Sequence, residues 1–523
     1  MIKRRYLYLL LLVPCLVFGQ QRDTVAERYS KTINTSLLRT HLEIVSSDEF
    51  EGRETGQKGQ KKAADYIRKE FKNLGLTPGN DTSFLQNYPL FLRRAADIDF
   101  SADTMHFKNK KDFRISLGSA VENQVVQTKE MIFLGYGRKD SSLAFNDYKK
   151  SGDLSGKVVI LYYGEPQLQQ DSKQKNRLQE QRSLTKEFAE KIKTVQQTGA
   201  CCALIITDDL SAAIKAFREN KVASTEKTVP GGVTKKELLV FFITPEMGDK
   251  IMDTNLEALM IARQKTGKSN VLKKKTSVKI DIHRDETGVS GDNVIGIVEG
   301  SSFKKNEYVF ITAHYDHLGI INGQLYNGAD DDGSGTVSVL ALARAFAKAK
   351  EEGHGPQRSV VFLTFSGEEK GLLGSKWFVE HPTIPLSAIE CDLNIDMIGR
   401  VDEVHSGDKN YLYIIGSDKL SSELQIINEQ TNSTYTKFKL DYTYNDANDP
   451  NRFYYRSDHY NFAKNNIPVV FYFNGTHPDY HQPTDKIEKI DFGLMEKRAQ
   501  LVFLTAWELA NRPTRIVVDS NKK

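Results

Sequence analysis

The chain contains 523 residues, a length that predicts two or three domains rather than one hydrophobic core. Hydrophobic residues make up 39% and charged residues 27% of the chain, and these ordinary values exclude a disordered or collagen-like protein. The formal net charge of +4 is close to neutral, so the composition gives no electrostatic basis for binding nucleic acid.

The N-terminal residues 1–19 have the pattern of a secretory signal peptide. Three basic residues at positions 3–5 precede an apolar run at 6–18, and a small residue separates this run from polar ones. The run is shorter than the about 20 residues that a membrane-spanning helix needs. An uncleaved membrane anchor and lipidation at Cys15 are the alternatives. We expect an exported protein, periplasmic or extracellular, whose mature chain has no membrane span.

The segment 124–273 differs in pattern from the residues on either side. It contains short strand-like runs separated by polar stretches, and it lacks any group of His, Asp and Glu residues with the spacing of metal ligands. The basic residues Lys273–Lys275 lie at its end. We therefore predict an inserted module at 124–273, between an N-terminal part of the main domain at 20–123 and its remainder at 274–523.

From residue 293 onward, strand-like and helix-like segments alternate. The strand-like runs are apolar throughout, and an Ala- and Leu-rich segment at 337–349 is expected to form a helix. This alternation predicts a mostly parallel sheet covered by helices on both faces. Functional sites in such sheets form at the carboxyl ends of the strands, so chemistry is expected at that edge. The strand-like runs are 294–298, 308–312, 360–365 and 467–473.

Five acidic or imidazole side chains fall at that edge of the predicted sheet. Four of them follow a strand-like run, directly or through a loop, with Asp396 directly after the short run 393–395, and the fifth precedes the helix at 337–349. They are His314, Asp331, Glu369, Asp396 and His481. Each alone has an ordinary explanation as a surface pair, a solvated turn, a helix cap or an exposed acid. Their recurrence at one edge favours a common site.

These residue types suit a site with two metal ions. Histidine nitrogen and carboxylate oxygen bind zinc, and a catalytic zinc site keeps one position open for water. Two metals about 3.5–4 Å apart can share one carboxylate and act together on the nucleophile and the carbonyl oxygen. Such a site needs an unligated base, and Glu368, directly before Glu369, is the natural candidate. Asp316 is expected to accept a hydrogen bond from the His314 imidazole. We therefore predict two Zn²⁺ per chain.

Several motifs resemble those of the dizinc aminopeptidases of metallopeptidase family twenty-eight, a group that also includes glutamate carboxypeptidase relatives. The matching segments are AHYDH (313–317), GADDDGSG (328–335), SGEEKGLLGS (366–375), NIDMIG (394–399), YH (480–481), SSDEFEGRETG (46–56) and NVIGIVEG (293–300). The resemblance implies that His314 and Asp396 bind one metal and that Glu369 and His481 bind the other. It further implies that Asp331 bridges the two metals, that Glu368 is the general base and that Tyr480 stabilises the oxyanion.

The same resemblance implies a three-layer α/β/α fold of the phosphorylase/hydrolase-like zinc-peptidase type. The module at 124–273 would then be an inserted, mainly β protease-associated domain. The expected activity is that of an aminopeptidase, which removes N-terminal residues from peptide or protein substrates. The alternatives are a glutaminyl cyclase with one zinc, a carboxypeptidase that releases glutamate, and an inactive receptor-like binding protein.

Other polar residues near these motifs are given lesser roles. Because five groups complete the ligand set, His317, His459 and His477 are expected not to bind metal. Asp458 lies in the segment RSDH (456–459), which also resembles the family. The favoured interpretation is that this segment only packs against the site, and a supporting or substrate-contacting role for Asp458 is the alternative.

Overall fold

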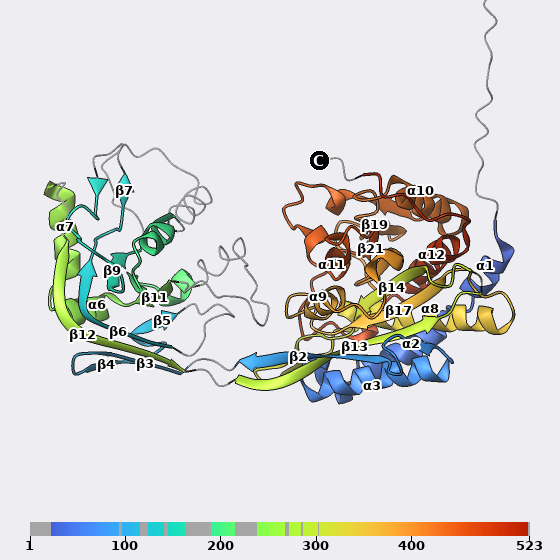
Figure 1. The fold of residues 1–523 in the computed structure, drawn as a ribbon, viewed down its shortest axis with the longest axis horizontal. Helices are drawn as coiled ribbons and strands as arrows, with labels where there is room; N and C mark the ends of the chain where they lie inside the picture. Colours follow the sequence, from blue (N-terminus) through green and yellow to red (C-terminus); the bar gives the residue numbers. More distant parts are fainter. Residues whose placement is uncertain are drawn as a thin grey trace, which may run out of the picture. The chain divides into compact units, whose positions relative to one another are not determined.

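The fold is described from a computed structural model of the chain (Figure 1). Residue contacts divide it into two units, one formed by residues up to 92 and from 288 onward, the other by residues 93–287. The expected signal peptide at 1–19 lies outside the described residues. The structure describes residues 22–520 apart from 94–96, 116–123, 141–144, 164–187, 189, 215–237, 267–270, 284–285 and 302.

The inserted unit begins at 93 rather than 124 and ends at 287 rather than 273, so its extent differs from the sequence-based expectation. Strand pairing explains the difference. Strand β3 (Asp97–Ala102) pairs with β12 (Leu272–His283), and β5 (Phe113–Ile115) pairs with β11 (Leu239–Ile243). Because the two partners of each pair lie far apart in the sequence, no local pattern marks where the unit begins.

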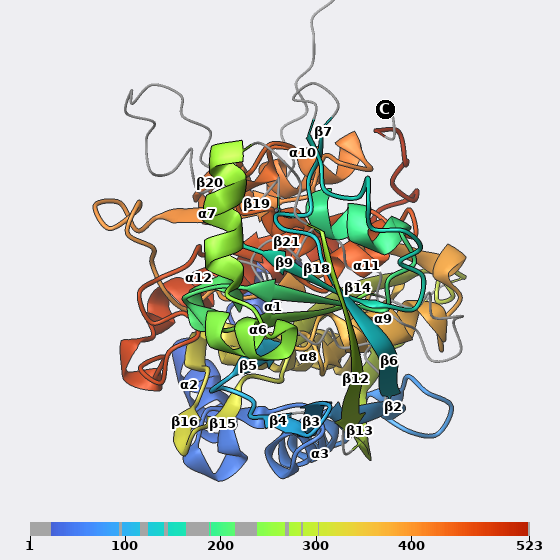
Figure 2. The same cartoon turned by 90° about the vertical axis from the view of Figure 1, so that its left-hand side faces the viewer.

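The inserted unit is built on one eight-stranded sheet in the order β4-β3-β12-β6-β9-β10-β11-β5. This unit also contains helices α6 (Pro245–Met252) and α7 (Leu256–Thr266), which are labelled in Figure 2. They contribute Met247, Ile251 and Met260 to an apolar cluster that includes residues of the sheet. Strands β9 to β11 are fully or almost fully buried, as expected for apolar strands at the centre of a sheet. The remaining strands are β4 (Met105–Phe107), β6 (Gln124–Phe133), β9 (Val158–Tyr162) and β10 (Cys202–Ile206), with the small pair β7 (Lys139–Asp140) and β8 (Phe145–Asn146).

The larger unit contains a nine-stranded sheet in the order β1-β13-β17-β14-β18-β21-β19-β20, with β2 also paired to β13. Its four central strands, β17 (Ser359–Phe365), β14 (Tyr308–His314), β18 (Ile389–Ile395) and β21 (Val469–Phe473), run parallel. The carboxyl ends of these four strands therefore meet at one edge. The other strands are β1 (Thr77–Pro78), β2 (Leu85–Arg93), β13 (Glu286–Val298), β19 (Tyr411–Ile415) and β20 (Lys439–Asp441), with the separate hairpin β15 (Gly319–Ile321) and β16 (Gln324–Tyr326).

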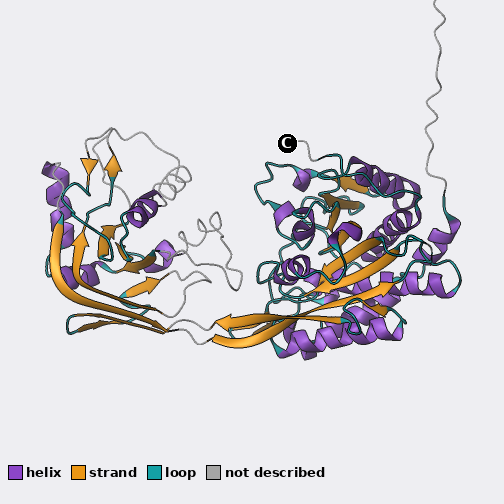
Figure 3. Cartoon of the chain, in the orientation of Figure 1, coloured by secondary structure: helices purple, strands orange, loops and turns teal. Residues whose placement is uncertain are grey.

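Helices cover both faces of this sheet (Figure 3). One face packs against α1 (Thr24–Ser30), α2 (Thr35–Val45), α3 (Lys58–Asn73), α8 (Gly335–Glu351), α10 (Ser422–Thr431) and α12 (Phe492–Asn511). The opposite face packs against α9 (Leu373–Glu380) and α11 (His459–Ala463) through Phe378 and Phe462. The arrangement is the predicted three-layer α/β/α fold.

Helix α8 belongs to the helical layer and directly follows the segment that contains Asp331. Twelve of its residues are buried, from Gly335 through Ala349, and so it is enclosed on nearly all sides. A helix that is apolar around its circumference is stable only inside a core, and small alanine side chains let neighbours approach closely. Among the described residues, none of the helices has both the length and the apolar character needed to cross a membrane.

Candidate metal centre

The predicted ligands come together at the carboxyl edge of the central sheet. His314 is the last residue of β14, Glu369 follows β17, and Asp396 directly follows β18. His481 lies in the loop after β21, and Asp331 lies in the short helical segment before α8. Because parallel strands end at the same edge, residues far apart in the sequence are brought within a few ångströms of one another.

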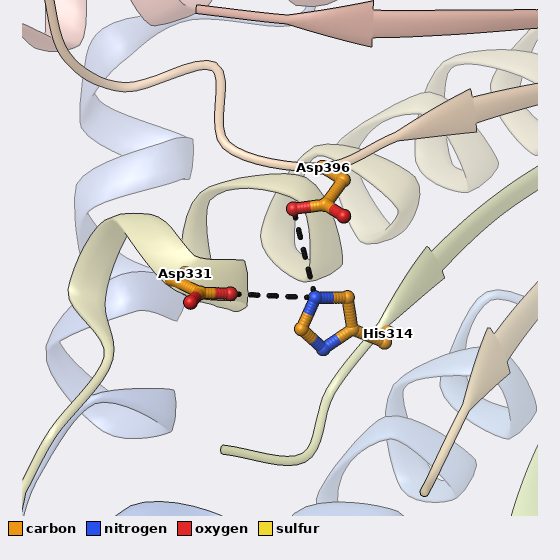
Figure 4. A group of neighbouring side chains, drawn as sticks. All are labelled: His314, Asp331 and Asp396. Carbon is orange, nitrogen blue, oxygen red and sulfur yellow. Dashed lines mark ion pairs between the residues drawn. The ribbon is translucent and has the colours of Figure 1, made fainter. Parts of the chain in front are cut away.

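The first group consists of His314, Asp331 and Asp396. The His314 Nε2 atom lies 3.4 Å from Asp331 Oδ1 and 3.6 Å from Asp396 Oδ1. Figure 4 shows this ring nitrogen facing both carboxylates. All three residues are buried, and ligand atoms from each lie within 4.8 Å of one another, so one cation could be held among them.

The second group faces the other oxygen of the same aspartate. The His481 Nε2 atom lies 3.1 Å from Asp331 Oδ2 and 3.2 Å from Glu369 Oε2. His317, which was expected not to bind metal, also lies here, with Nδ1 2.9 Å from Glu369 Oε1. Because Asp331 presents Oδ1 to one group and Oδ2 to the other, its carboxylate is placed to serve both.

The chemistry of these atoms fits metal ions. The set offers only imidazole nitrogens and carboxylate oxygens, which are zinc donors. Asp331 Oδ2 and Glu369 Oε1 are buried and have no hydrogen-bond partner among the described residues. Burying carboxylate oxygens without partners is costly, and a bound cation would remove that cost. Burial opposes ionisation of Asp331, but the imidazoles of His314 and His481 hold its pKa well below the usual range.

Glu368 lies beside both groups and is bound to neither. Its Oε2 is 4.0 Å from His314 Nε2, and its side chain is 11% exposed. Burial raises the pKa of Glu368 well above the ordinary value, and the charges of Glu369 and Asp396 raise it further against the opposing effect of His314. This is the setting of a carboxylate that can accept and return a proton.

Tyr480 lies next to His481, with the two rings stacked at 4.0 Å between centroids. Burial raises the pKa of Tyr480 far above the ordinary value, so its hydroxyl stays protonated near neutral pH and can donate a hydrogen bond. The Arg456 guanidinium donates to the Tyr480 oxygen at 3.3 Å. The hydroxyl is thereby held at the edge of the site.

Asp316 supports the site in a different way from the one expected. The His314 Nδ1 atom lies 3.1 Å from the main-chain carbonyl oxygen of Asp316, and it is 3.7 Å from the carboxylate. The carboxylate instead accepts hydrogen bonds from the Thr55 hydroxyl at 2.7 Å and the Glu368 amide at 3.1 Å. Asp316 therefore orients the His314 ring with its backbone and ties the Glu368 loop with its side chain.

The carboxylates of Asp330 and Asp332, on either side of Asp331, accept hydrogen bonds from nearby main-chain and side-chain groups. Asp330 accepts from the Ser334 hydroxyl and the Gly399 amide, and its Oδ2 lies 3.1 Å from His477 Nε2. Asp332 accepts from the Gly335 and Met397 amides. The Asp332 carboxylate thus accepts a hydrogen bond from the first amide of α8.

Two residues of the N-terminal segment support the site and carry no role in the sequence-based prediction. Arg53 is completely buried, and its guanidinium donates to four carbonyl oxygens, those of Val45, Tyr315, Asn327 and Gly328, at 2.6 to 2.9 Å. Thr55 donates to Asp316 and accepts from the Gly367 amide. The only signal in the sequence was the family-like segment at 46–56, which does not say what these side chains touch.

Ser457 and Asp458 lie behind the first group. The Ser457 hydroxyl donates to Asp396 Oδ2 at 2.7 Å and fixes that carboxylate. Asp458 is fully buried, and burial raises its pKa to about 7. Neither carboxylate oxygen of Asp458 has a hydrogen-bond partner among the described residues.

A pocket opens onto the site, and one of its walls is apolar. The residues that line it include Met397, Phe453, Phe471 and Phe473 together with the ligands of the first group, Glu368 and Tyr480. The Phe473 ring centroid lies 5.0 Å from that of Phe453 and 5.2 Å from that of Phe471. Among the described residues lining the pocket, Arg456 is the only lysine or arginine.

Comparison with known sequences agrees with the motifs. The profile of peptidase family M28 matches residues 293–506. The chain is 27% identical over 318 residues to aminopeptidase YwaD of Bacillus subtilis. The aligned region covers 59% of this chain and 62% of that protein. It is 30% identical over 213 residues to a probable leucine aminopeptidase of Arthroderma benhamiae. This alignment covers 40% of this chain and 55% of that protein. The chain thus spans less than two thirds of the length of these relatives.

Solved structures support the fold. An aminopeptidase from Aneurinibacillus sp. strain AM-1 aligns over 94% of this chain and 98% of its own, with a TM-score of 0.53 and 20% identity. The zinc aminopeptidase BSAP from Bacillus subtilis aligns over 94% of this chain and 99% of its own, with a TM-score of 0.50 and 19% identity. At these identities the likeness confirms the fold class.

Proposed function

We propose, on the premise that the chain belongs to peptidase family M28 through residues 293–506, that it is a zinc-dependent aminopeptidase. The observation that carries the proposal is the double use of Asp331, whose Oδ1 faces His314 and whose Oδ2 faces His481. A carboxylate shared in this way, with an unligated glutamate beside it, is the arrangement that two-metal hydrolysis requires.

The proposed cofactors are two Zn²⁺ per chain. His314 and Asp396 would hold one ion, Glu369 and His481 the other, and Asp331 both. When bound, two zinc ions increase the acidity of water and polarise the carbonyl group of a peptide bond. This pairing follows the two groups of side chains around Asp331, which are close enough to share its carboxylate.

The proposed role of Glu368 is general base and then general acid. Its carboxylate takes one proton from the water molecule that attacks the carbonyl carbon. As the carbon–nitrogen bond breaks, the same carboxylate returns that proton to the departing amine. Burial raises the pKa of Glu368, which makes its carboxylate a stronger base than an exposed glutamate and favours uptake of the proton from water.

Tyr480 is proposed to donate its hydroxyl hydrogen to the oxyanion that forms at the carbonyl oxygen. Such donors stabilise the transition state more than the substrate when they are fixed in place beforehand. The stacking of Tyr480 on His481 and the contact from Arg456 support a fixed position. Asp316 is proposed to act through others, by orienting His314 and the Glu368 loop.

The proposed substrates are peptides or small proteins with an apolar N-terminal residue. The pocket beside Glu368 is lined by Met397 and three phenylalanine rings, which favour burial of an apolar side chain. A carboxypeptidase that recognises glutamate would need several cations for its carboxylates, and the described lining offers Arg456 alone among lysines and arginines. This observation favours the aminopeptidase.

Two further proposals concern the rest of the chain. The unit 93–287 is proposed to be a protease-associated domain, on the basis of its position within the peptidase unit and its predominance of strands. Residues 1–19 are proposed to direct export to the periplasm or the extracellular space.

Glu368→Gln tests the proposed chemistry against its neighbour, Glu369→Gln. The first variant should keep its metal content and lose about 10²–10⁴-fold in kcat or more, because only the base is removed. The second should lose metal. Elemental analysis and a panel of aminoacyl chromogenic substrates, with and without a chelator, measure both effects.

If Glu368→Gln loses its metal while Glu369→Gln keeps it, the two roles are reversed. A fully active protein with one metal per chain would contradict the dinuclear site and favour a glutaminyl cyclase.

A further inference from the structure

His317 is a buried imidazole for which the five-ligand set provides no role. Its side chain has no exposed surface, and neither ring nitrogen has a hydrogen-bond partner among the described residues. Nδ1 is in ion-pair range of Glu369, but a buried ring that makes no hydrogen bond is costly and calls for an explanation.

The ring is also tightly held. A Cβ atom at Gly328 would lie 2.5 Å from the Cγ and Cδ2 atoms of His317, so the ring packs directly on the glycine backbone. Gly328 belongs to the loop that leads to Asp331, and its φ of 57° suits glycine. The loop that supplies the bridging carboxylate therefore also fixes the direction of the His317 ring.

The direction is toward the second group of candidate ligands. His317 Nδ1 lies 2.9 Å from Glu369 Oε1 and 3.8 Å from Asp331 Oδ2. These two oxygens are themselves buried and lack hydrogen-bond partners among the described residues. Three donor atoms, each buried without a hydrogen bond, thus converge on one point, and ligand atoms from the three residues lie within 4.8 Å of one another.

His481 approaches the same point from the solvent side. Its Nε2 atom contacts the other Glu369 oxygen and Asp331 Oδ2, and its side chain is 35% exposed. The rings of His317 and His481 are inclined at 64° with centroids 5.9 Å apart. Two imidazoles at this spacing can direct one nitrogen each to a single ion between them.

We propose that His317 is a fourth protein ligand of the second zinc ion, beside Asp331, Glu369 and His481. The proposal rests on the dinuclear site described above. It makes the two metal positions unequal. The second has four protein ligands, the number typical of a closed zinc site, and the first has three, which leaves room for water and substrate.

Because the two positions differ in their number of protein ligands, the two zinc ions should bind in a fixed order. The apoprotein should take up its first zinc ion at the position with four ligands, and the position of His314 and Asp396 should fill second.

Zinc X-ray absorption spectroscopy and a zinc titration of the apoprotein test the proposal. The wild-type protein loaded with two zinc ions should show three imidazoles in total, and His317→Ala should show two. His317→Ala should weaken the tighter zinc site by more than the 10–100-fold that loss of a supporting hydrogen bond costs. The fluorescence of Trp377 and Trp507 reports whether the variants remain folded.

Two variants separate metal binding from other roles. The amide of His317→Gln can donate a hydrogen bond to Glu369 but lacks the imidazole nitrogen, so wild-type zinc affinity in this variant would overturn the proposal. His459→Ala also removes a fully buried imidazole without hydrogen-bond partners among the described residues, and it should leave both zinc affinities unchanged. Two imidazoles in both wild-type protein and His317→Ala would overturn the ligand assignment alone. Failure of the wild-type protein to bind a second zinc ion would overturn the dinuclear site as well.

Discussion

Arg53→Lys is expected to destabilise the larger unit although the charge is kept. Arg53 donates to four buried carbonyl oxygens, two of which belong to the loop before Asp331 and one to Tyr315, next to His314. A lysine ammonium has three N–H donors, so at least one of the four carbonyls must lose its partner. One buried carbonyl left unpaired costs about 1–3 kcal/mol.

Urea unfolding followed by tryptophan fluorescence measures this loss selectively. The chain has two tryptophans, Trp377 and Trp507, and both lie in the larger unit, so the signal reports that unit and not residues 93–287. With an m-value of about 3 kcal/mol/M, the expected loss lowers the urea midpoint by roughly 0.3–1 M. Zinc affinity should fall as well, because the loops of His314 and Asp331 lose their common support.

Arg39→Lys is the matched control. Arg39 is exposed and lies 4.1 Å above the Phe492 ring, a contact that lysine can also make. Its midpoint should stay close to that of the wild-type protein. If Arg53→Lys unfolds at the wild-type midpoint, the four hydrogen bonds do not stabilise the unit as argued.

Two other perturbations test the site and the core. Asp331→Asn should lower the occupancy of both metals together. Asp330→Asn and Asp332→Asn should mainly lower the free energy of unfolding, by about 1 kcal/mol where a helix cap is weakened. Metal titrations in which Asp331→Asn keeps both ions would show that the bridge lies elsewhere. Burial lowers the pKa of His41 to about 4, with a further effect from Arg344. The folded state therefore favours the neutral form of His41. The contribution of this group to the free energy of unfolding is complete above pH 6.5 and is lost as the pH falls from 6.5 to 4. The loss amounts to roughly 3 kcal/mol. His41→Gln should lose less stability than the wild-type apoprotein between pH 7 and pH 4, and equal losses in the two proteins would contradict this account.

The sequence allowed the sheet edge to be predicted because the relevant signals are local. Apolar runs identify the central strands. Residues near the end of such a run, such as His314 and Asp396, are thereby placed at the carboxyl edge of the sheet. The same reasoning excluded His317, since five candidates already completed a ligand set. Only the three-dimensional arrangement shows the ring of His317 facing Glu369.

Other features depend on contacts between distant parts of the chain, which periodicity does not reveal. Arg53 contacts carbonyls more than 260 residues away, and nothing in its neighbourhood specifies those partners. The start of the inserted unit was missed for the same reason, because β3 pairs with β12. The choice between backbone and carboxylate of Asp316 as partner of His314 rests on a difference of less than 1 Å.

The division of the larger unit into two chain segments bears on the order of events during synthesis. Residues 93–287 are continuous and can fold as soon as they leave the ribosome, since domains fold as units from the N-terminal side. Residues 22–92, however, cannot complete their contacts until later segments have been made. Arg53 needs the carbonyl groups of residues 315, 327 and 328. Helices α1 and α2 pack against α12, which ends at Asn511. Arg498 in α12 also holds the carbonyls of Ile398 and Arg400, just after Asp396. A nascent chain can therefore carry a finished insert while the larger unit and its candidate metal centre stay incomplete until α12 has been synthesised.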